Sequence, residues 1–249
     1  MKDPRLRMVK KWRPPYDVGK FSKDTITKIA EDVVYLLATR GDPRLEGPDW
    51  ERIFANSIGA KWAPSNVGLD DVILGNCAWG AKTVKNNFPS KAKKVRLISG
   101  RNAPEYSFPD SPTKRVNVDP DPLGEKVISI WNERVSSVKA KFKHLRTVVL
   151  IKSNDLTELA LFEFETALFD PDEIEWQWNE QGNLEGYDEE EIHRFTWQPH
   201  GAQFTIIEDV PKDRVAFKIK LPGQIDKKRV LREVGFNESW ITMLPPRED

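Results

Sequence analysis

The stretch "GLDDVILGNCAWGAKTVKNNF", residues 68–88, contains two short apolar runs separated by Gly75 and Asn76. Glycine and asparagine suit the tight turns that join neighbouring strands. The runs at 71–75 and 78–84 are therefore predicted to be antiparallel strands of one hairpin.

Side chains alternate between the two faces of a strand, so Lys82 is expected to share a face with Ala78 and Gly80. Asp70 and Asp71 stand at the start of the preceding strand. Across the predicted hairpin, a carboxylate and the Lys82 ammonium can converge over a floor of small residues.

Outward from this hairpin, apolar residues at helical spacing predict helices over about 21–41, 47–59 and 123–142, with a last helix around 224–234. Runs rich in β-branched and aromatic residues predict further strands. These strands are expected at 94–99, 146–152, 158–167, 173–178, 192–198, 203–209 and 215–221. Residues 107–122, rich in proline and aspartate, are the best candidate for a linker.

This order of elements indicates an α/β fold, with one mixed β-sheet flanked by helices and an added β-rich C-terminal region. We expect residues 1–249 to form a single domain. Its N-terminal helical and hairpin part would cover about 20–152, and its β-rich part about 153–249.

Composition excludes several classes of protein. No apolar run approaches the length of a membrane span, and the N-terminus lacks the apolar core of a secretory signal, so a cytoplasmic protein without membrane contact is expected. The single cysteine excludes an internal disulfide framework and a cysteine-rich zinc site. A metal ion, if present, would be held by oxygen atoms.

The charges are balanced in number but unevenly distributed. Lysine plus arginine and aspartate plus glutamate each number 39, whereas the tract from Val72 to Pro104 contains seven basic residues and no acid. Residues 171–191 carry nine acids and no base. Such segregation produces a local positive field that attracts polyanions, although a solvated basic loop beside an acidic hairpin explains it equally well.

A carboxylate beside a lysine has a specific use in phosphodiester hydrolysis. A divalent cation polarises the phosphate and lowers the pKa of the attacking water, and Mg²⁺ prefers one or two carboxylates plus waters and substrate oxygens. The lysine would orient the nucleophile or offset charge developing on phosphorus.

Here the sequence resembles the PD-(D/E)XK nucleases, in particular type II restriction endonucleases. Their pattern is an acid at the start of one strand, then an acid, any residue and a lysine on the next. Asp71 matches the first acid and Lys82 the lysine, which implies a restriction-endonuclease-like sheet. The segments "KKVRLISGRNAPEYSF" and "FTWQPHGAQFTI" also look like parts of restriction-enzyme-like proteins.

The sequence departs from this pattern at Gly80, where the second acid belongs. Some members of the superfamily recruit that acid from a helix, and Glu51 on the predicted second helix is our choice for it. The resemblance thus implies Asp71, Lys82 and Glu51 as catalytic residues, and Asp71, Glu51 and Asp70 as Mg²⁺ ligands, with Glu105 in reserve. Ordinary structural roles explain the same residues: a turn for the aspartates, an exposed strand position for Lys82 and a first-turn acid for Glu51.

A nuclease also needs side chains that read bases. Arginine and asparagine suit guanine and adenine edges, and a polar hairpin between two aromatic strands suits a DNA groove. We therefore expect contacts with duplex DNA from Lys85, Arg101, Asn102, Arg194, Gln198, His200 and Gln203. The basic N-terminal segment, residues 2–13, would hold phosphates without reading bases, and a disordered tail explains it equally well. A polar hairpin packed by its tryptophan is the structural alternative.

The sequence therefore predicts a Mg²⁺-dependent type II restriction endonuclease. It would act as a homodimer, because two strands must be cut and palindromic sites mirror two-fold symmetry. The alternatives are a DNA-binding module on a nuclease-like scaffold that has lost catalysis, and a protein whose basic tract has nothing to do with nucleic acid.

Overall fold

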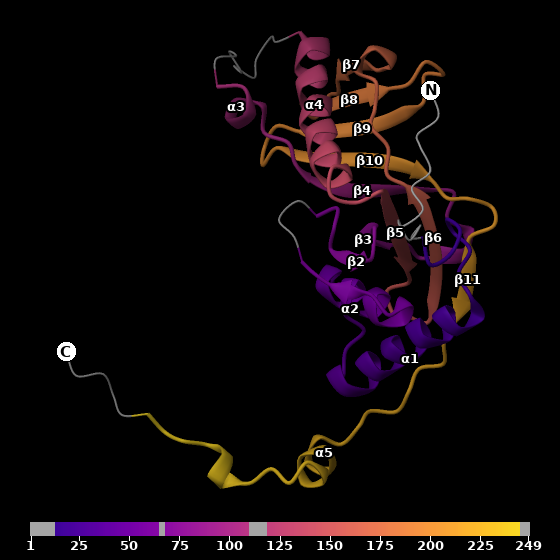
Figure 1. Cartoon of the computed structure of the whole chain (residues 1–249), viewed down its shortest axis with the longest axis vertical. Helices are drawn as coiled ribbons and strands as arrows, with labels where there is room; N and C mark the ends of the chain where they lie inside the picture. Colours follow the sequence, from indigo (N-terminus) through magenta and orange to yellow (C-terminus); the bar gives the residue numbers. More distant parts are fainter. Residues whose placement is uncertain (1–12, 65–67, 110–118, 245–249) are drawn as a thin grey trace, which may run out of the picture.

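The computed structural model describes residues 13–64, 68–109 and 119–244, which contain five α-helices and two β-sheets (Figure 1). The helices are α1 (Lys23–Arg40), α2 (Gly47–Ile58), α3 (Pro104–Ser107), α4 (Pro120–Lys139) and α5 (Lys227–Glu233). The strands are β1 (Lys61–Trp62), β2 (Val72–Leu74), β3 (Cys77–Lys85), β4 (Lys94–Arg101), β5 (His144–Lys152), β6 (Glu158–Glu165), β7 (Glu175–Trp178), β8 (Leu184–Tyr187), β9 (His193–Gln198), β10 (Gln203–Asp209) and β11 (Val215–Lys218).

The first sheet, here sheet A, is mixed and has the strand order β1-β2-β3-β5-β6-β11. The predicted hairpin is present, because β2 and β3 pair antiparallel with Leu74 opposite Cys77 across Gly75 and Asn76. Strands β3 and β5 are parallel, and the chain between them includes α4, as a parallel pair requires. The remaining neighbours are antiparallel.

The second sheet, sheet B, is antiparallel with the order β4-β10-β9-β8-β7. Helices α1 and α2 cover one face of sheet A, where the buried cluster is centred on Trp50, Phe54 and Trp79. Helix α4 packs on sheet B through Val127 and Trp131. The other face of sheet A meets β4, so the two sheets join there (Figure 1).

The structure confirms the α/β class and a mixed sheet flanked by helices. It departs from the prediction in having a second sheet rather than one sheet with an added region. That sheet takes β4 from the N-terminal part, while β6 and β11 of the C-terminal part join sheet A, so the predicted boundary near 152 does not separate the sheets. The connection 153–157 is short, so β6 pairs with β5, the strand that precedes it in the chain.

Two smaller predictions also change. The proposed linker 107–122 ends inside α4, which begins at Pro120. A helix accepts proline in its first turn because the N–H groups there make no intrahelical hydrogen bond. Residues 110–118 of the proposed linker lie outside the described residues. Strand β8 was missed because it has only four residues and contains Gly186. A side chain at this glycine would collide with the Trp176 ring, which lies 3.0 Å from the position of a Cβ.

Sheet A is held at its centre by a buried carboxylate. Glu163 on β6 has a fully buried side chain and accepts hydrogen bonds from Trp79 Nε1 on β3, Gly19 N and the Tyr16 hydroxyl. The Arg146 guanidinium lies 3.6 Å from the same carboxylate. Burial raises the pKa of Glu163, and these donors oppose that shift. One acid therefore links three strands to the segment before α1.

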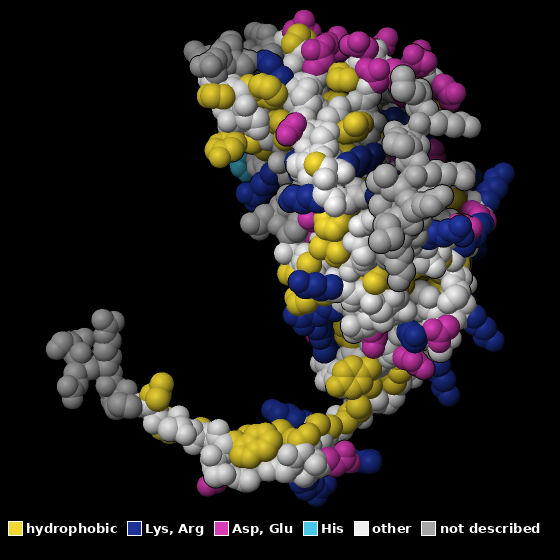
Figure 2. All heavy atoms as spheres, viewed as in Figure 1, with side chains coloured by type: hydrophobic (Ala, Val, Ile, Leu, Met, Phe, Trp, Pro, Cys, Tyr) yellow, Lys and Arg dark blue, Asp and Glu magenta, His cyan; other side chains and the backbone are white. Residues whose placement is uncertain are grey.

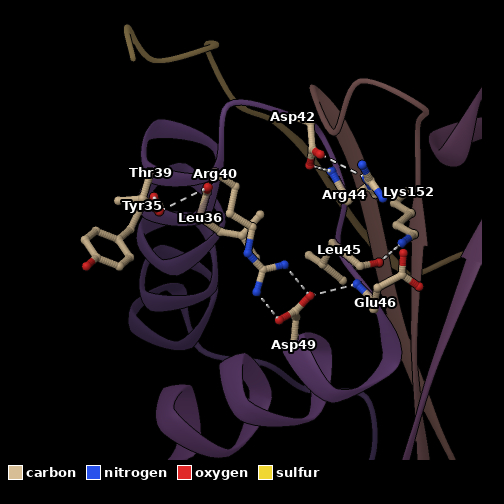
Figure 3. A network of polar contacts seen from close by, with 10 residues as sticks. All are labelled: Tyr35, Leu36, Thr39, Arg40, Asp42, Arg44, Leu45, Glu46, Asp49 and Lys152. Atoms are coloured by element: carbon tan, nitrogen blue, oxygen red, sulfur yellow. Dashed lines mark hydrogen bonds and ion pairs between the residues drawn. The ribbon is translucent and has the colours of Figure 1, made fainter. Parts of the chain in front are cut away.

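A second polar network fixes the start of α2 (Figure 3). Arg40 at the end of α1 donates two hydrogen bonds to the Asp49 carboxylate, at 2.7 and 2.6 Å. Asp49 also accepts from Glu46 N at 2.9 Å, which caps the helix, and Lys152 Nζ donates to Leu45 O. The network joins α1, α2 and the end of β5, and so positions the helix that carries Glu51.

Among helices of the described residues, none is both long enough and apolar enough to cross a bilayer.

We expect Asp49→Asn to lower the free energy of unfolding by about 1 kcal/mol, because a cap and an ion pair are lost while the half-exposed Arg40 remains screened by solvent. The hydrogen bonds from Arg40 lower the pKa of Asp49 below its ordinary value of 3.8. A depressed carboxyl pKa contributes stability above the unfolded value and loses it as pH falls through the folded value. Urea unfolding of both proteins should therefore show the difference shrinking below pH 3.8; a difference independent of pH would contradict this role.

Candidate active site and nucleic-acid interface

The β2–β3 register puts Asp71 and Lys82 on the same face of sheet A. Val72 lies opposite Trp79, and continuing the register by one residue places Asp71 opposite Gly80. The adjoining β1–β2 pairing also continues, because Ala63 N donates to Asp71 O at 2.8 Å. Directly opposed residues share a face, and so do residues two apart in a strand. The aspartate and the lysine therefore point to the same side of the sheet.

The electrostatics of Lys82 identify which acids lie near it. Burial lowers the pKa of the Lys82 ammonium, and the carboxylate charge of Asp71 opposes this shift. The positive charge of Arg134 lowers the pKa further, while Glu51 raises it. The charges of Asp71 and Glu51 therefore both favour the charged form of Lys82. The ammonium also donates to Gly68 O at 3.1 Å.

Glu51 lies at the edge of sheet A beside β1. Its carboxylate accepts a hydrogen bond from Trp62 Nε1 at 2.9 Å, and the Arg52 guanidinium lies 3.9 Å over the Trp62 ring. The indole therefore holds Glu51 in place from the short strand next to the hairpin. Asp70, which precedes Asp71, is half-buried, and Glu105 lies half-exposed in the single turn of α3.

The position of the missing motif acid is occupied by backbone. A Cβ added to Gly80 would lie 3.1 Å from Gly68 O and 3.3 Å from Leu69 Cα. Such distances are tighter than ordinary contacts, so a side chain at Gly80 would require the segment at residues 68–69 to shift. Glycine here lets that segment approach and place its carbonyl on the Lys82 ammonium.

Lys82 lines a cavity of about 210 Å³ between the two sheets. The other polar walls come from Thr147 and Thr166, which share a hydrogen bond, from Ser99 on β4, and from the acids Glu165 on β6 and Glu208 on β10. Burial raises the pKa of Glu208 to about 7. The cavity is thus lined by one lysine and two acids, one of which holds its proton more tightly than usual.

Arg134 on α4 was missed by the sequence reasoning. Its guanidinium donates to Ser99 O at 2.6 Å and to Asn102 Oδ1 at 3.2 Å. The pattern did contain a signal, because Arg134 falls on the helical stripe formed by Val127, Trp131 and Val138, which are all buried. A charged residue on such a stripe has a partner inside the fold or a function.

The donors near Lys82 suit a hard cation. Asp71 and Glu51 supply oxygen, and two carboxylates completed by waters and a phosphate are what Mg²⁺ commonly uses. Cys77 is buried on the opposite face of the sheet, so sulfur does not take part. Within the described ranges, no three His, Cys, Asp or Glu side chains gather closely enough to form a metal site by themselves.

Three of the predicted DNA-contacting residues form a row across sheet B. Arg101 lies opposite Gln203, which lies opposite Gln198 on the next strand. His200 is exposed in the turn that joins these last two strands. Strand β4 connects this row to the cavity, because Ser99 lines the cavity and Arg101 ends the same strand. Lys85 stands exposed at the end of β3.

Two other predicted DNA contacts have structural partners instead. Asn102 is fully buried; its side chain donates to Val127 O at 2.8 Å and accepts from Arg134. Arg194 donates to Asp188 at 2.6 Å and to Asp209 at 3.0 Å. The burial of Asn102 and the neutralisation of Arg194 do not fit the base-reading roles expected for them, since both side chains are committed to the fold. Of the basic N-terminal segment, residues 2–12 lie outside the described residues.

Charge is segregated in space as well as in sequence. Figure 2 shows acidic side chains gathered at the end of the body that carries β7 and β8, whereas lysine and arginine are spread along the margin between α3 and α2. The acidic end therefore lies away from the hairpin that carries Lys82, and a polyanion can approach the hairpin without meeting it.

Comparison of the chain with family models, curated proteins and solved structures finds no match.

We expect the burial of Lys82 to appear as a pH dependence of stability. Because the pKa is lowered in the folded state, the unfolded chain binds more protons between that lowered value and the ordinary 10.5. The cost of removing water from the half-buried Lys82 ammonium is then greatest near neutral pH and fades toward pH 10.5. Relative to Lys82→Met, the free energy of unfolding should rise from about pH 7 to about pH 10 in urea titrations.

Lys139→Met, at an exposed site in the last turn of α4, is the control for this titration. A wild-type curve parallel to that of Lys82→Met would show that Lys82 keeps an ordinary pKa.

Proposed function

We propose that this chain is a Mg²⁺-dependent endodeoxyribonuclease of the restriction type, with a divergent PD-(D/E)XK site on sheet A. The observation that carries the proposal is the shared face of Asp71 and Lys82 on the β2–β3 hairpin. The charges of Asp71 and Glu51 both raise the pKa of the Lys82 ammonium, against the effect of burial. The β2–β3 hairpin supplies the strand context that the pattern requires.

In this proposal Asp71, Glu51, Lys82 and Arg134 have different roles in hydrolysis. Asp71 and Glu51 would hold Mg²⁺, which supplies a Lewis acid for the scissile phosphate and activates the attacking water. Lys82 would position that water or offset the charge that develops on phosphorus. The neighbouring positive charge of Arg134 would favour binding of the phosphate on the same face.

Sequence selection would come from the row formed by Arg101, Gln203 and Gln198, with His200 at its end. Arginine and glutamine are the residues whose paired donors and acceptors match guanine and adenine edges in the major groove. Two copies would be needed to cut both strands of a palindromic site, so a homodimer acting on cytoplasmic duplex DNA is part of the proposal.

A second function rests on the position of Gly80. Backbone lies where the motif places its second acid, so the chain would be a DNA-binding module if Glu51 does not replace that acid. The two functions share the same surface and differ only in hydrolysis.

Incubation with plasmid DNA and Mg²⁺ tests the first function. We expect discrete fragments that disappear with EDTA, and a loss of rate of at least about 100-fold in Lys82→Ala and in Asp71→Asn. Lys139→Ala, which removes an exposed lysine from α4, should cut normally. A retarded but intact plasmid would favour the binding module, and neither cleavage nor retardation would remove both functions.

Replacement of Arg101 tests whether the row formed by Arg101, Gln203 and Gln198 selects the DNA sequence. Arg101→Ala should weaken binding to the preferred sequence by about 1–3 kcal/mol while non-specific binding changes little. Arg194→Ala should leave sequence preference intact, because its guanidinium is already paired with Asp188 and Asp209. Gel-shift titrations against preferred and scrambled duplexes measure both. Equal losses on the two duplexes would show that Arg101 holds phosphate only.

A further inference from the structure

The cavity between the two sheets has walls that the proposed hydrolysis does not use. Its volume of about 210 Å³ is below the roughly 300–1,000 Å³ of sites that hold drug-sized molecules. Three aromatic side chains line it, from α4, from β6 and from the chain that follows β6. These are Trp131, Phe164 and Phe169. The space therefore suits one small group with apolar faces.

The aromatic side chains favour a flat occupant. Trp131 and Phe169 are stacked, with ring centroids 6.2 Å apart and an angle of 26° between the ring planes. Phe164 and Phe169 are half-buried and line the cavity, so part of each ring is open to an occupant. Aromatic side chains stack on any nucleobase, because every base has a π-face.

One polar side chain in the wall differs from the others. Those that have a hydrogen-bond or ion-pair partner in the protein are Lys82, Ser99, Thr147, Glu165 and Thr166. Glu208 on β10 also lines the cavity, and among the described residues its carboxyl has no such partner. Buried polar groups are normally hydrogen-bonded, so this carboxyl needs a partner that enters from the cavity.

The surroundings of Glu208 favour its neutral form. Burial raises its pKa to about 7, while the charge of Arg194 lowers the pKa and that of Asp209 raises it. Glu208 also lines a second hollow, beside Arg194. The other titratable side chains that line the two spaces are Lys82 and Glu165 in the first, and Asp170, Glu173, Asp188, Glu189 and Glu190 in the second. A neutral carboxyl offers an O–H donor beside an acceptor oxygen.

We propose that this cavity binds a single nucleobase whose edge has a donor beside an acceptor, such as adenine or cytosine, stacked on the aromatic wall and paired with the Glu208 carboxyl. The base comes from a free nucleotide or from a DNA strand, and the recognising chemistry is the same. A duplex cannot enter a space of this size, so a base from DNA has to leave its stack. The inference uses no step of the hydrolysis and stands apart from the nuclease proposal.

Calorimetric titration of the full chain with adenosine and cytidine tests the pocket without DNA. We expect binding below pH 7, with a dissociation constant that rises about tenfold per pH unit above pH 7 as the carboxyl loses its proton. Glu208→Gln keeps a donor and an acceptor but does not titrate, so it should bind equally on both sides of pH 7. Glu208→Leu should weaken binding below pH 7 at least about tenfold. Glu190→Gln, at an exposed acid, should match the wild type.

Gel-shift titration distinguishes the two sources of the base. A base taken from DNA is easiest to extrude at a mismatch. Tighter binding to a duplex with one A·C mismatch than to the matched duplex, lost in Glu208→Leu, would show that the base comes from DNA. Nucleoside binding without this preference would assign the pocket to free nucleotides. If neither nucleoside binding nor mismatch preference depends on Glu208, the proposal is overturned. A failure of plasmid cleavage alters none of these readouts.

Discussion

The buried carboxylate of Glu163 is the constraint on which the rest of the structure depends. An unpaired charge at this depth would cost several kcal/mol, so its partners stabilise the fold. Trp79 Nε1, Gly19 N and the Arg146 guanidinium meet it from three different parts of the chain. The bond from Trp79 turns that side chain toward α1 and α2. Because side chains alternate along β3, Lys82 is then directed to the opposite face.

That opposite face is where the two sheets meet, and this junction sets the surroundings that shift the pKa of Lys82. The cavity walls from β4, β10 and α4 exclude much of the water around the ammonium, and burial lowers its pKa while nearby carboxylates oppose the shift. A lysine on an open sheet face would lack this balance. The same strand, β4, continues from the cavity to Arg101, so the proposed chemistry and the proposed base reading share one rigid element.

Gly80 is the position at which the hairpin departs from the PD-(D/E)XK pattern that the sequence resembles, and the structure shows what occupies that place. The absence of a side chain lets residues 68 and 69 pass close to β3 and puts a carbonyl on Lys82. An acid at this position would displace that segment. Glu51, the acid proposed to replace the missing ligand, is held by Trp62, and its helix is held by the pair between Arg40 and Asp49. In the proposed site this acid is therefore anchored independently of the hairpin.

The sequence by itself determined the local elements: helices α1, α2 and α4 and the turn at Gly75 and Asn76 follow from periodicity and turn chemistry, which act over a few residues. It also determined that Asp71 and Lys82 would share a face. Only the tertiary structure decided the second sheet, the burial of Asn102 and the place of Arg134 beside the site. These depend on contacts such as that between Asn102 and Trp197, 95 positions apart, which no local pattern encodes.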